Sequence, residues 1–116
     1  MVTESRSIDR VHVVWKATLT RLNGEQLPGS TDNVSEQGMN VILGKALVVG
    51  EPVRVEVVSK CTGMICYFTL EGEIIYSNFL ESRLGSAIGL RLLKPSDQYI
   101  EFIRRYTGKQ GSVLAS

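Results

Sequence analysis

The chain alternates between apolar and polar side chains over residues 10–20, RVHVVWKATLT. Successive side chains of a β-strand point to opposite faces, so this pattern predicts a strand with one face in a core and the other in solvent. Asn23 and Gly24 follow, and this dipeptide readily adopts the positive φ values of a tight hairpin turn. The chain is therefore expected to reverse there into an antiparallel second strand. The side chains predicted to face the core are Val11, Val13, Trp15, Ala17 and Leu19.

More short segments of strand character follow this first hairpin. Pro28 and Gly29 interrupt the returning second strand, which predicts an edge position or a bulge there. Apolar runs and period-two alternation, rich in β-branched and aromatic residues, then predict the remaining strands. These are residues 39–43, residues 53–57, residues 64–77 as one long strand or two short ones, and residues 86–93.

The apolar pattern changes to helical spacing after Pro95. Ser96 or Asp97 can cap the start of a helix and Gly108 can end it, so the tail from residue 109 is expected to be disordered. The sequence therefore predicts a mostly β fold, a small antiparallel barrel of about six strands with a C-terminal α-helix. The helix residues expected to seal one end of the barrel are Tyr99, Phe102 and Ile103.

Length and charge narrow the classes of function. The 116 residues suit one domain, and their net charge of +1 lacks the basic excess of proteins that bind long nucleic acid. Cys61, Cys66 and His12 are too few ligands for a closed zinc site, so no metal or cofactor is expected. His12 has no catalytic partner at a recognisable motif spacing, which disfavours an enzyme. No apolar run is long enough to span a bilayer, and we expect a cytoplasmic protein.

Two polar motifs flank the first hairpin. Arg6 and Arg10 form an Arg-x-x-x-Arg before the first strand, and Asn33, Ser35 and Gly38 form an Asn-x-Ser-x-x-Gly before the third. Each motif alone has an ordinary explanation, as solvated arginines near a terminus or as turn chemistry. In this order, on a small barrel that ends in a helix, they resemble the PilZ domain, whose family pattern is Arg-x-x-x-Arg followed by Asp/Asn-x-Ser-x-x-Gly.

The resemblance implies a receptor for cyclic di-GMP, a bacterial second messenger. Residues 1–10 would form a flexible segment that clamps the ligand, residues 11–108 the barrel and helix, and residues 109–116 the disordered tail. Arg6 and Arg10 would be the clamp, because a guanidinium group binds phosphate or the guanine O6/N7 edge with two hydrogen bonds and also stacks on a base. The signal would pass to an attached domain or a downstream protein when ligand orders the clamp.

On the barrel side, the resemblance implies that Asn33 and Ser35 offer polar groups to guanine and phosphate, while Gly38 allows close approach of the backbone. Asn33 keeps an acceptor oxygen but lacks the negative charge that an aspartate would present to a guanine N–H. Ser5 stands where many family members carry another arginine, which implies one bound ligand rather than a stacked pair.

Two other interpretations remain. The first is a relative of the same family that binds no nucleotide and acts only as a protein–protein adaptor, which the intact motifs disfavour. The second is a small barrel that binds single-stranded nucleic acid through exposed aromatic rings. The near-neutral charge disfavours it, and Trp15 and Tyr67 are expected to pack in the core.

Overall fold

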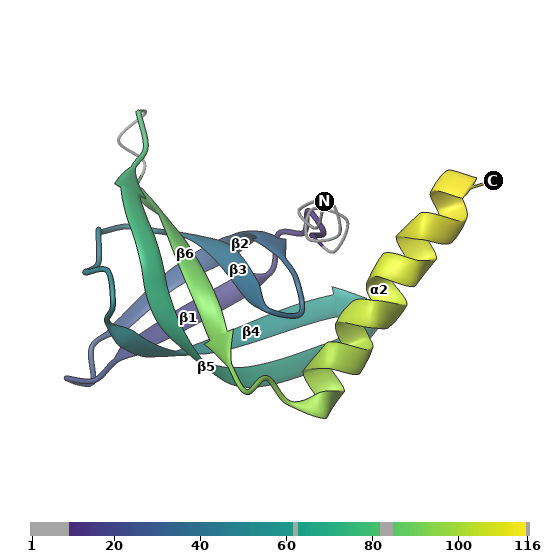
Figure 1. The fold of residues 1–116 in the computed structure, drawn as a ribbon, viewed down its shortest axis with the longest axis horizontal. Helices are drawn as coiled ribbons and strands as arrows, with labels where there is room; N and C mark the ends of the chain where they lie inside the picture. Colours follow the sequence, from purple (N-terminus) through teal and green to yellow (C-terminus); the bar gives the residue numbers. More distant parts are fainter. Residues whose placement is uncertain (1–9, 62, 82–84, 116) are drawn as a thin grey trace, which may run out of the picture.

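Six strands close into an antiparallel barrel, and a long helix lies across one end of it (Figure 1). The structure is a computed structural model that describes residues 10–61, 63–81 and 85–115. Around the barrel the strand order is β1-β2-β3-β6-β5-β4, which confirms the predicted fold class. The elements are β1 (Lys16–Arg21), β2 (Gln26–Val34), β3 (Gly38–Leu43), β4 (Pro52–Cys61), β5 (Met64–Phe79), β6 (Ser86–Leu93) and α2 (Asp97–Ala115).

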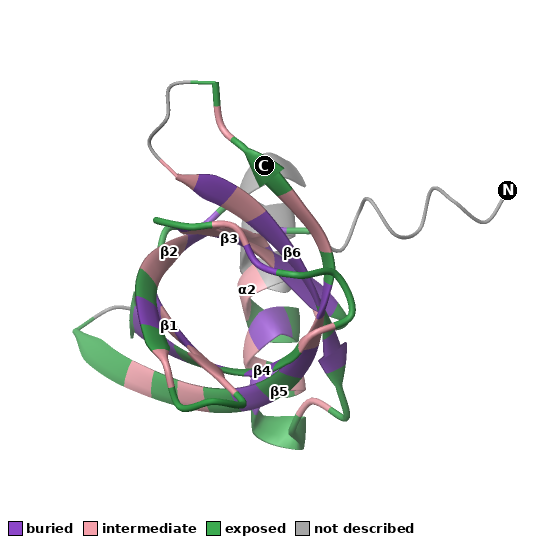
Figure 2. Cartoon of the chain, turned by 90° about the vertical axis from the view of Figure 1, so that its left-hand side faces the viewer, coloured by how far each residue is buried: buried purple, intermediate pink, exposed green. Residues whose placement is uncertain are grey.

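One hydrophobic core joins residues of the barrel strands and of α2, and Figure 2 colours the buried residues of these elements purple. Every strand contributes buried apolar side chains to it. Tyr99 and Ile103 of α2 are 0% and 1% exposed, so the helix closes the barrel end as predicted. Trp15 packs there too, with ring centroids 5.8 Å from Phe102 and 6.0 Å from Tyr106. Burial of these large aromatic side chains is a main source of stability for so small a domain.

The chain enters the barrel through residues 11–15, an extended segment that precedes β1. The predicted alternation holds, because Val13 and Trp15 are buried while Val14 between them is exposed. The regular strand ladder, however, starts only at Lys16. Before it, the Trp15 N–H donates to Thr31 Oγ1 over 2.8 Å, and that hydroxyl donates to the Val13 carbonyl over 2.7 Å. A buried threonine hydroxyl therefore replaces part of the ladder, which side-chain periodicity cannot reveal.

The second strand is neither at an edge nor broken at proline. β2 lies between β1 and β3 and runs continuously through Pro28, so the expected edge position is wrong. Pairing with β3 begins only at Gly29, opposite Leu43, so the missing N–H of Pro28 breaks no hydrogen bond to that strand. A bulge does occur in β2, but further along, between Thr31 and Asn33.

Two further predictions, about β5 and α2, are wrong. The Tyr67 side chain is 74% exposed rather than in the core. Its neighbour Phe68 takes the inward-facing position of β5, with its ring centroid 5.5 Å from that of Tyr99. The helix continues past Gly108 to Ala115, which places most of the expected disordered tail within α2. One glycine in a helix costs about 1 kcal/mol and does not by itself end it.

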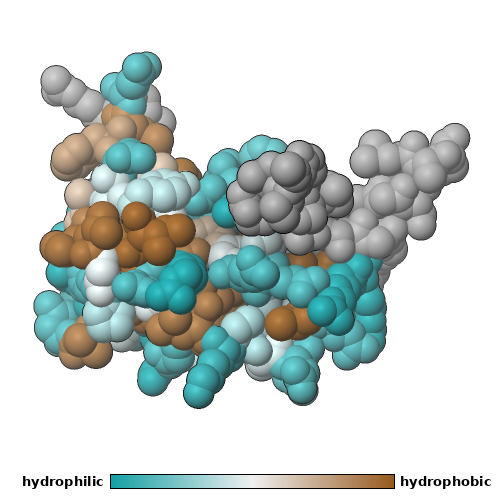
Figure 3. Space-filling model, in the orientation of Figure 1, coloured by the Kyte–Doolittle hydropathy of each residue, from teal (hydrophilic) through white to brown (hydrophobic). Residues whose placement is uncertain are grey.

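Several large apolar side chains of the described residues are exposed to solvent. On the side shown in Figure 3 they form separate patches among polar residues. The most exposed are Leu22 at 82%, Val14 at 80% and Phe79 at 80%. Such scattered apolar exposure is normal for a protein surface. Within the described part of the chain, no helix has the length and apolar composition needed to cross a membrane.

Candidate functional site

Arg10 and Asn33, which belong to different motifs, are hydrogen-bonded to each other. Val11 and Val34 exchange backbone hydrogen bonds of 2.8 and 2.9 Å, which hold the incoming chain beside the end of β2. Arg10 and Asn33 are their immediate neighbours, and Arg10 Nη1 donates to Asn33 Oδ1 over 2.6 Å. One residue of each motif is thus brought to the same place on the barrel surface. Arg6, the other predicted clamp residue, lies outside the described residues.

Ser35 and Gly38 build the turn that joins β2 to β3. Ser35 is 7% exposed, and its Oγ accepts hydrogen bonds from the backbone N–H groups of Gly38, at 3.1 Å, and Gln37, at 3.3 Å. The Ser35 N–H donates to the Gly38 carbonyl over 2.8 Å. A Cβ on Gly38 would lie 2.5 Å from the Leu90 carbonyl oxygen of β6. Both residues therefore shape the turn and its packing on β6, and the serine hydroxyl points into the turn.

The same turn is attached to α2. The Tyr99 hydroxyl donates to the Ser35 carbonyl over 2.7 Å in a buried contact. Burial, helped by the Glu36 carboxylate, raises the pKa of Tyr99, so its hydroxyl keeps the proton that it donates. Arg104 of α2 makes two hydrogen bonds to Glu36, of 3.0 and 3.3 Å, and these raise the pKa of Arg104. The turn between β2 and β3 is thus linked to the C-terminal helix by one buried and two exposed hydrogen bonds.

Asp32 and His12 lie beside Asn33 and, with Arg10, form a polar cluster around it. The contact between Asp32 and His12 was not predicted from the sequence. Asn33 Nδ2 donates to Asp32 Oδ2 over 3.2 Å. His12 Nδ1 lies 2.8 Å from the Asp32 carbonyl oxygen and 3.9 Å from its carboxylate. His12 is 81% exposed in its side chain, as its outward position in the alternation predicts. Twenty residues of sequence separate the pair, so no local motif could have found it.

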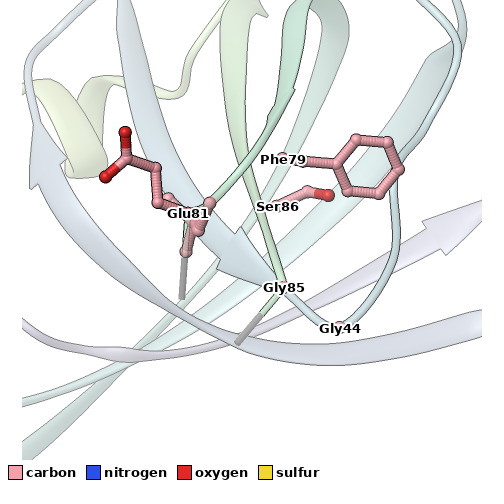
Figure 4. A pocket seen from close by; sticks show the side chains of 6 residues that line it. Gly44, Phe79, Glu81, Gly85 and Ser86 are labelled. Carbon is pink, nitrogen blue, oxygen red and sulfur yellow. The ribbon is translucent and has the colours of Figure 1, made fainter. Parts of the chain in front are cut away.

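A separate pocket of about 440 Å³ lies where the end of β3 meets the β5–β6 connection (Figure 4). It contains none of the motif residues. Phe79, Glu81 and Ser86 line it with neighbouring glycines, and its described lining residues include no lysine or arginine that could neutralise a phosphate, whereas the polar cluster holds Arg10. Among the residues that the structure describes, no group of three or more His, Cys, Asp or Glu side chains could hold a metal ion. The Arg10–Asn33 cluster is therefore the better candidate for an anionic ligand.

Comparison with known proteins gives one family match and several similar structures. The sequence model of the PilZ domain family matches residues 4–109, a range that contains both motifs. A search of curated proteins finds no match.

Three solved structures share the fold. The Bacillus subtilis inhibitor of motility, MotI/DgrA, is 14% identical with a TM-score of 0.77 over 89% of this chain, which spans 49% of that protein. The PilZ domain of YcgR from Escherichia coli, solved with c-di-GMP, is 16% identical with a TM-score of 0.64, covering 86% of each chain. The PilZ domain of CeSA from a cellulose-synthesizing bacterium is 17% identical with a TM-score of 0.55, covering 88% of this chain and 97% of that one.

Proposed function

Because the chain belongs to the PilZ domain family, we propose that it is a receptor for cyclic di-GMP. The proposed ligand site is the surface around Arg10 and Asn33, completed by Arg6 from the segment that precedes the barrel. Ser35 and Gly38 support this site by shaping the turn beneath it. The E. coli relative solved with c-di-GMP supports the choice of ligand, since this chain shares its fold. The proposed activity is binding, with no catalytic step.

The contact between Arg10 and Asn33 is the observation that carries the proposal. It holds an exposed guanidinium group against the barrel with one N–H at Asn33 Oδ1, while arginine has five N–H donors in a planar fork. The remaining donors are available to a phosphate or to the O6/N7 edge of guanine, both of which match the fork. A ligand with two phosphate charges and two guanine bases offers Arg10 and Arg6 a target each. We expect one ligand per chain.

The proposed signal is the ordering of residues 1–10 over the ligand. A ligand shifts this segment only if it binds the closed arrangement more tightly than the open one, and the two arginines supply that difference. The closed segment then presents a new surface to an attached domain or a downstream protein. Hydrogen exchange at the backbone amides of residues 1–10 should slow when cyclic di-GMP is added, and an unchanged exchange rate would contradict this mechanism.

Calorimetric titration tests the ligand and the clamp together. The protein is titrated with cyclic di-GMP, GTP and cyclic GMP, and the first titration is repeated on Arg10→Ala and Arg54→Ala. Arg54 is the control because it is an exposed arginine on another part of the barrel, paired with Glu71 at 3.2 Å. The Arg10→Ala variant loses charge-assisted hydrogen bonds and should bind cyclic di-GMP about tenfold more weakly or worse. The Arg54→Ala variant should bind it less than about twofold more weakly. Equal effects of the two substitutions would refute the clamp.

A protein–protein adaptor that binds no nucleotide is the second candidate. One observation favours it: the hydrogen bonds of the turn and its close packing on β6 account for a serine at 35 and a glycine at 38 without any ligand. These motif residues would be retained for folding even without a ligand. An adaptor would give no heat with cyclic di-GMP and would bind its protein partner equally well after replacement of both Arg6 and Arg10.

A further inference from the structure

The polar cluster leaves one acceptor group with unused capacity, and that group lies outside both motifs. Asn33 is engaged at both ends of its amide, by Arg10 at 2.6 Å and Asp32 at 3.2 Å. Ser35 Oγ is taken up by the turn. Asp32, by contrast, has a side chain 50% exposed, and its Oδ1 accepts no hydrogen bond from the described residues. The nearest ring nitrogen, His12 Nδ1, is 3.9 Å from that oxygen.

We propose that Asp32 is the residue that selects guanine at this site, an inference that rests on the proposed function. A carboxylate offers two acceptor oxygens and no donor. The guanine edge carries the N1–H and N2–H₂ donors side by side, so its two donors match the two oxygens in a charge-assisted pair. An asparagine amide cannot do this, because it presents one acceptor and one donor. Asp32 thus supplies, one residue earlier, the negative charge that Asn33 lacks.

The backbone sets Asp32 apart from its neighbours in β2. Thr31 pairs with Val41 and Asn33 with Asn40, so Asp32 is the extra residue of a β-bulge. Bulges redirect a side chain from the direction that regular alternation would give it. Here the redirected carboxylate lies next to Asn33 rather than on the opposite face of the strand.

Two contacts then hold Asp32 in place. Asn33 Nδ2 donates to one carboxylate oxygen and leaves the other for a ligand. His12 Nδ1 lies 2.8 Å from the Asp32 carbonyl oxygen. Because a carbonyl oxygen only accepts, this contact requires Nδ1 to carry the hydrogen and to donate it. The carboxylate acceptors of Asp32 and the guanidinium donors of Arg10 are thus held on the two ends of one Asn33 amide, and guanine carries both donors and acceptors to match them.

The role of Asp32 is tested by a double-mutant-type cycle in which one change is made in the protein and the other in the ligand. Affinities for cyclic di-GMP and cyclic di-IMP, which lacks the 2-amino group of guanine, are measured for the parent, Asp32→Asn and Glu56→Gln. Glu56 is a control because it is an exposed carboxylate of β4 whose change alters the net charge equally. The parent should prefer cyclic di-GMP about tenfold, and Asp32→Asn should lower that preference below about threefold. Glu56→Gln and the carboxylate-retaining Asp32→Glu should keep the preference of the parent.

The possible failures are distinguishable. If Asp32→Asn weakens both ligands equally and keeps the preference, Asp32 only positions its neighbours and the assignment is overturned. If the variant binds cyclic di-GMP as the parent does, the assignment falls while the proposed function stands. If the parent binds neither ligand, the proposed function fails and takes the assignment with it. A thermal melt of each variant shows whether an affinity change reflects unfolding.

Discussion

Replacing Tyr99 with phenylalanine removes one buried hydroxyl group and leaves the aromatic ring in place. Tyr99 is 0% exposed, and its hydroxyl donates over 2.7 Å to the Ser35 carbonyl. In Tyr99→Phe this carbonyl remains buried beneath α2 without its donor. The ring keeps its edge-on packing against Phe68, 5.5 Å between centroids, so the apolar contribution to stability is unchanged.

The expected effect follows from the buried acceptor that is left behind. A hydrogen bond between neutral groups contributes about 1 kcal/mol net, whereas an unsatisfied buried acceptor costs about 1–3 kcal/mol. We therefore expect the free energy of unfolding to fall by about 1–3 kcal/mol. In a domain of this size each kcal/mol lowers the Tm by roughly 3–6 °C, so the change is well within reach of measurement.

Urea unfolding of the parent, Tyr99→Phe and Tyr67→Phe measures this difference. Tyr67→Phe is the matched control because it removes the same hydroxyl from a side chain that is 74% exposed, and it should change the free energy of unfolding by less than about 0.5 kcal/mol. The three proteins should share one m-value, which shows that only stability differs. If Tyr99→Phe is as stable as Tyr67→Phe, the Ser35 carbonyl does not depend on the helix and the reasoning is refuted.

Three other changes test separate features of the structure. Burial raises the pKa of Tyr99 above its ordinary value of 10.0, so the unfolded chain loses that proton first as the pH rises. The free energy of unfolding should therefore fall with pH above about pH 10, and the fall should be ~1.4 kcal/mol per pH unit steeper in the parent than in Tyr99→Phe. Urea unfolding at a series of alkaline pH values measures both slopes. Gly38→Ala places a Cβ 2.5 Å from the Leu90 carbonyl oxygen and should destabilise by roughly 1–3 kcal/mol in thermal melts, whereas Gly44→Ala meets nothing within 4 Å. Ser59→Ala removes a buried hydroxyl that has no partner among the described residues, so urea unfolding should show unchanged or slightly higher stability, by up to about 1 kcal/mol.

Each of these three expectations has a contrary result. Equal alkaline slopes would mean that Tyr99 ionises as easily when folded as when unfolded. Equal melting of Gly38→Ala and Gly44→Ala would mean that β3 and β6 can separate without cost. A loss of more than about 1 kcal/mol in Ser59→Ala would mean that the hydroxyl is bound, for example to a buried water.

Local patterns were enough to predict most of the architecture. Alternation over residues 10–20 identified which side chains face the core, because that choice depends only on the period of a strand. The spacing of Tyr99 and Ile103 likewise predicted the helix face that closes the barrel. The prediction for Tyr67 was wrong because both faces of this strand carry apolar side chains. Only the packing of α2 against the Phe68 face decides which of the two faces is buried.

The arrangement of the candidate site could be predicted from the sequence only in part. The motifs pointed to Asn33 and Ser35, yet their different roles follow from hydrogen bonds that no motif states. Ser35 is turned into the loop and held by α2, while Asn33 faces Arg10. Asp32 was overlooked because an aspartate beside a motif looks like ordinary turn chemistry until the bulge in β2 redirects it.

The sequence by itself determined the periods, the turn at Asn23 and Gly24, and the chemical types available at each motif. These properties arise between near neighbours in the chain, where backbone geometry alone sets the relation. Only the tertiary structure decided that Arg10 meets Asn33 and that Tyr99 reaches Ser35, across 23 and 64 residues. Those contacts exist because the barrel closes and the helix caps it, and closure depends on all the strand pairings at once.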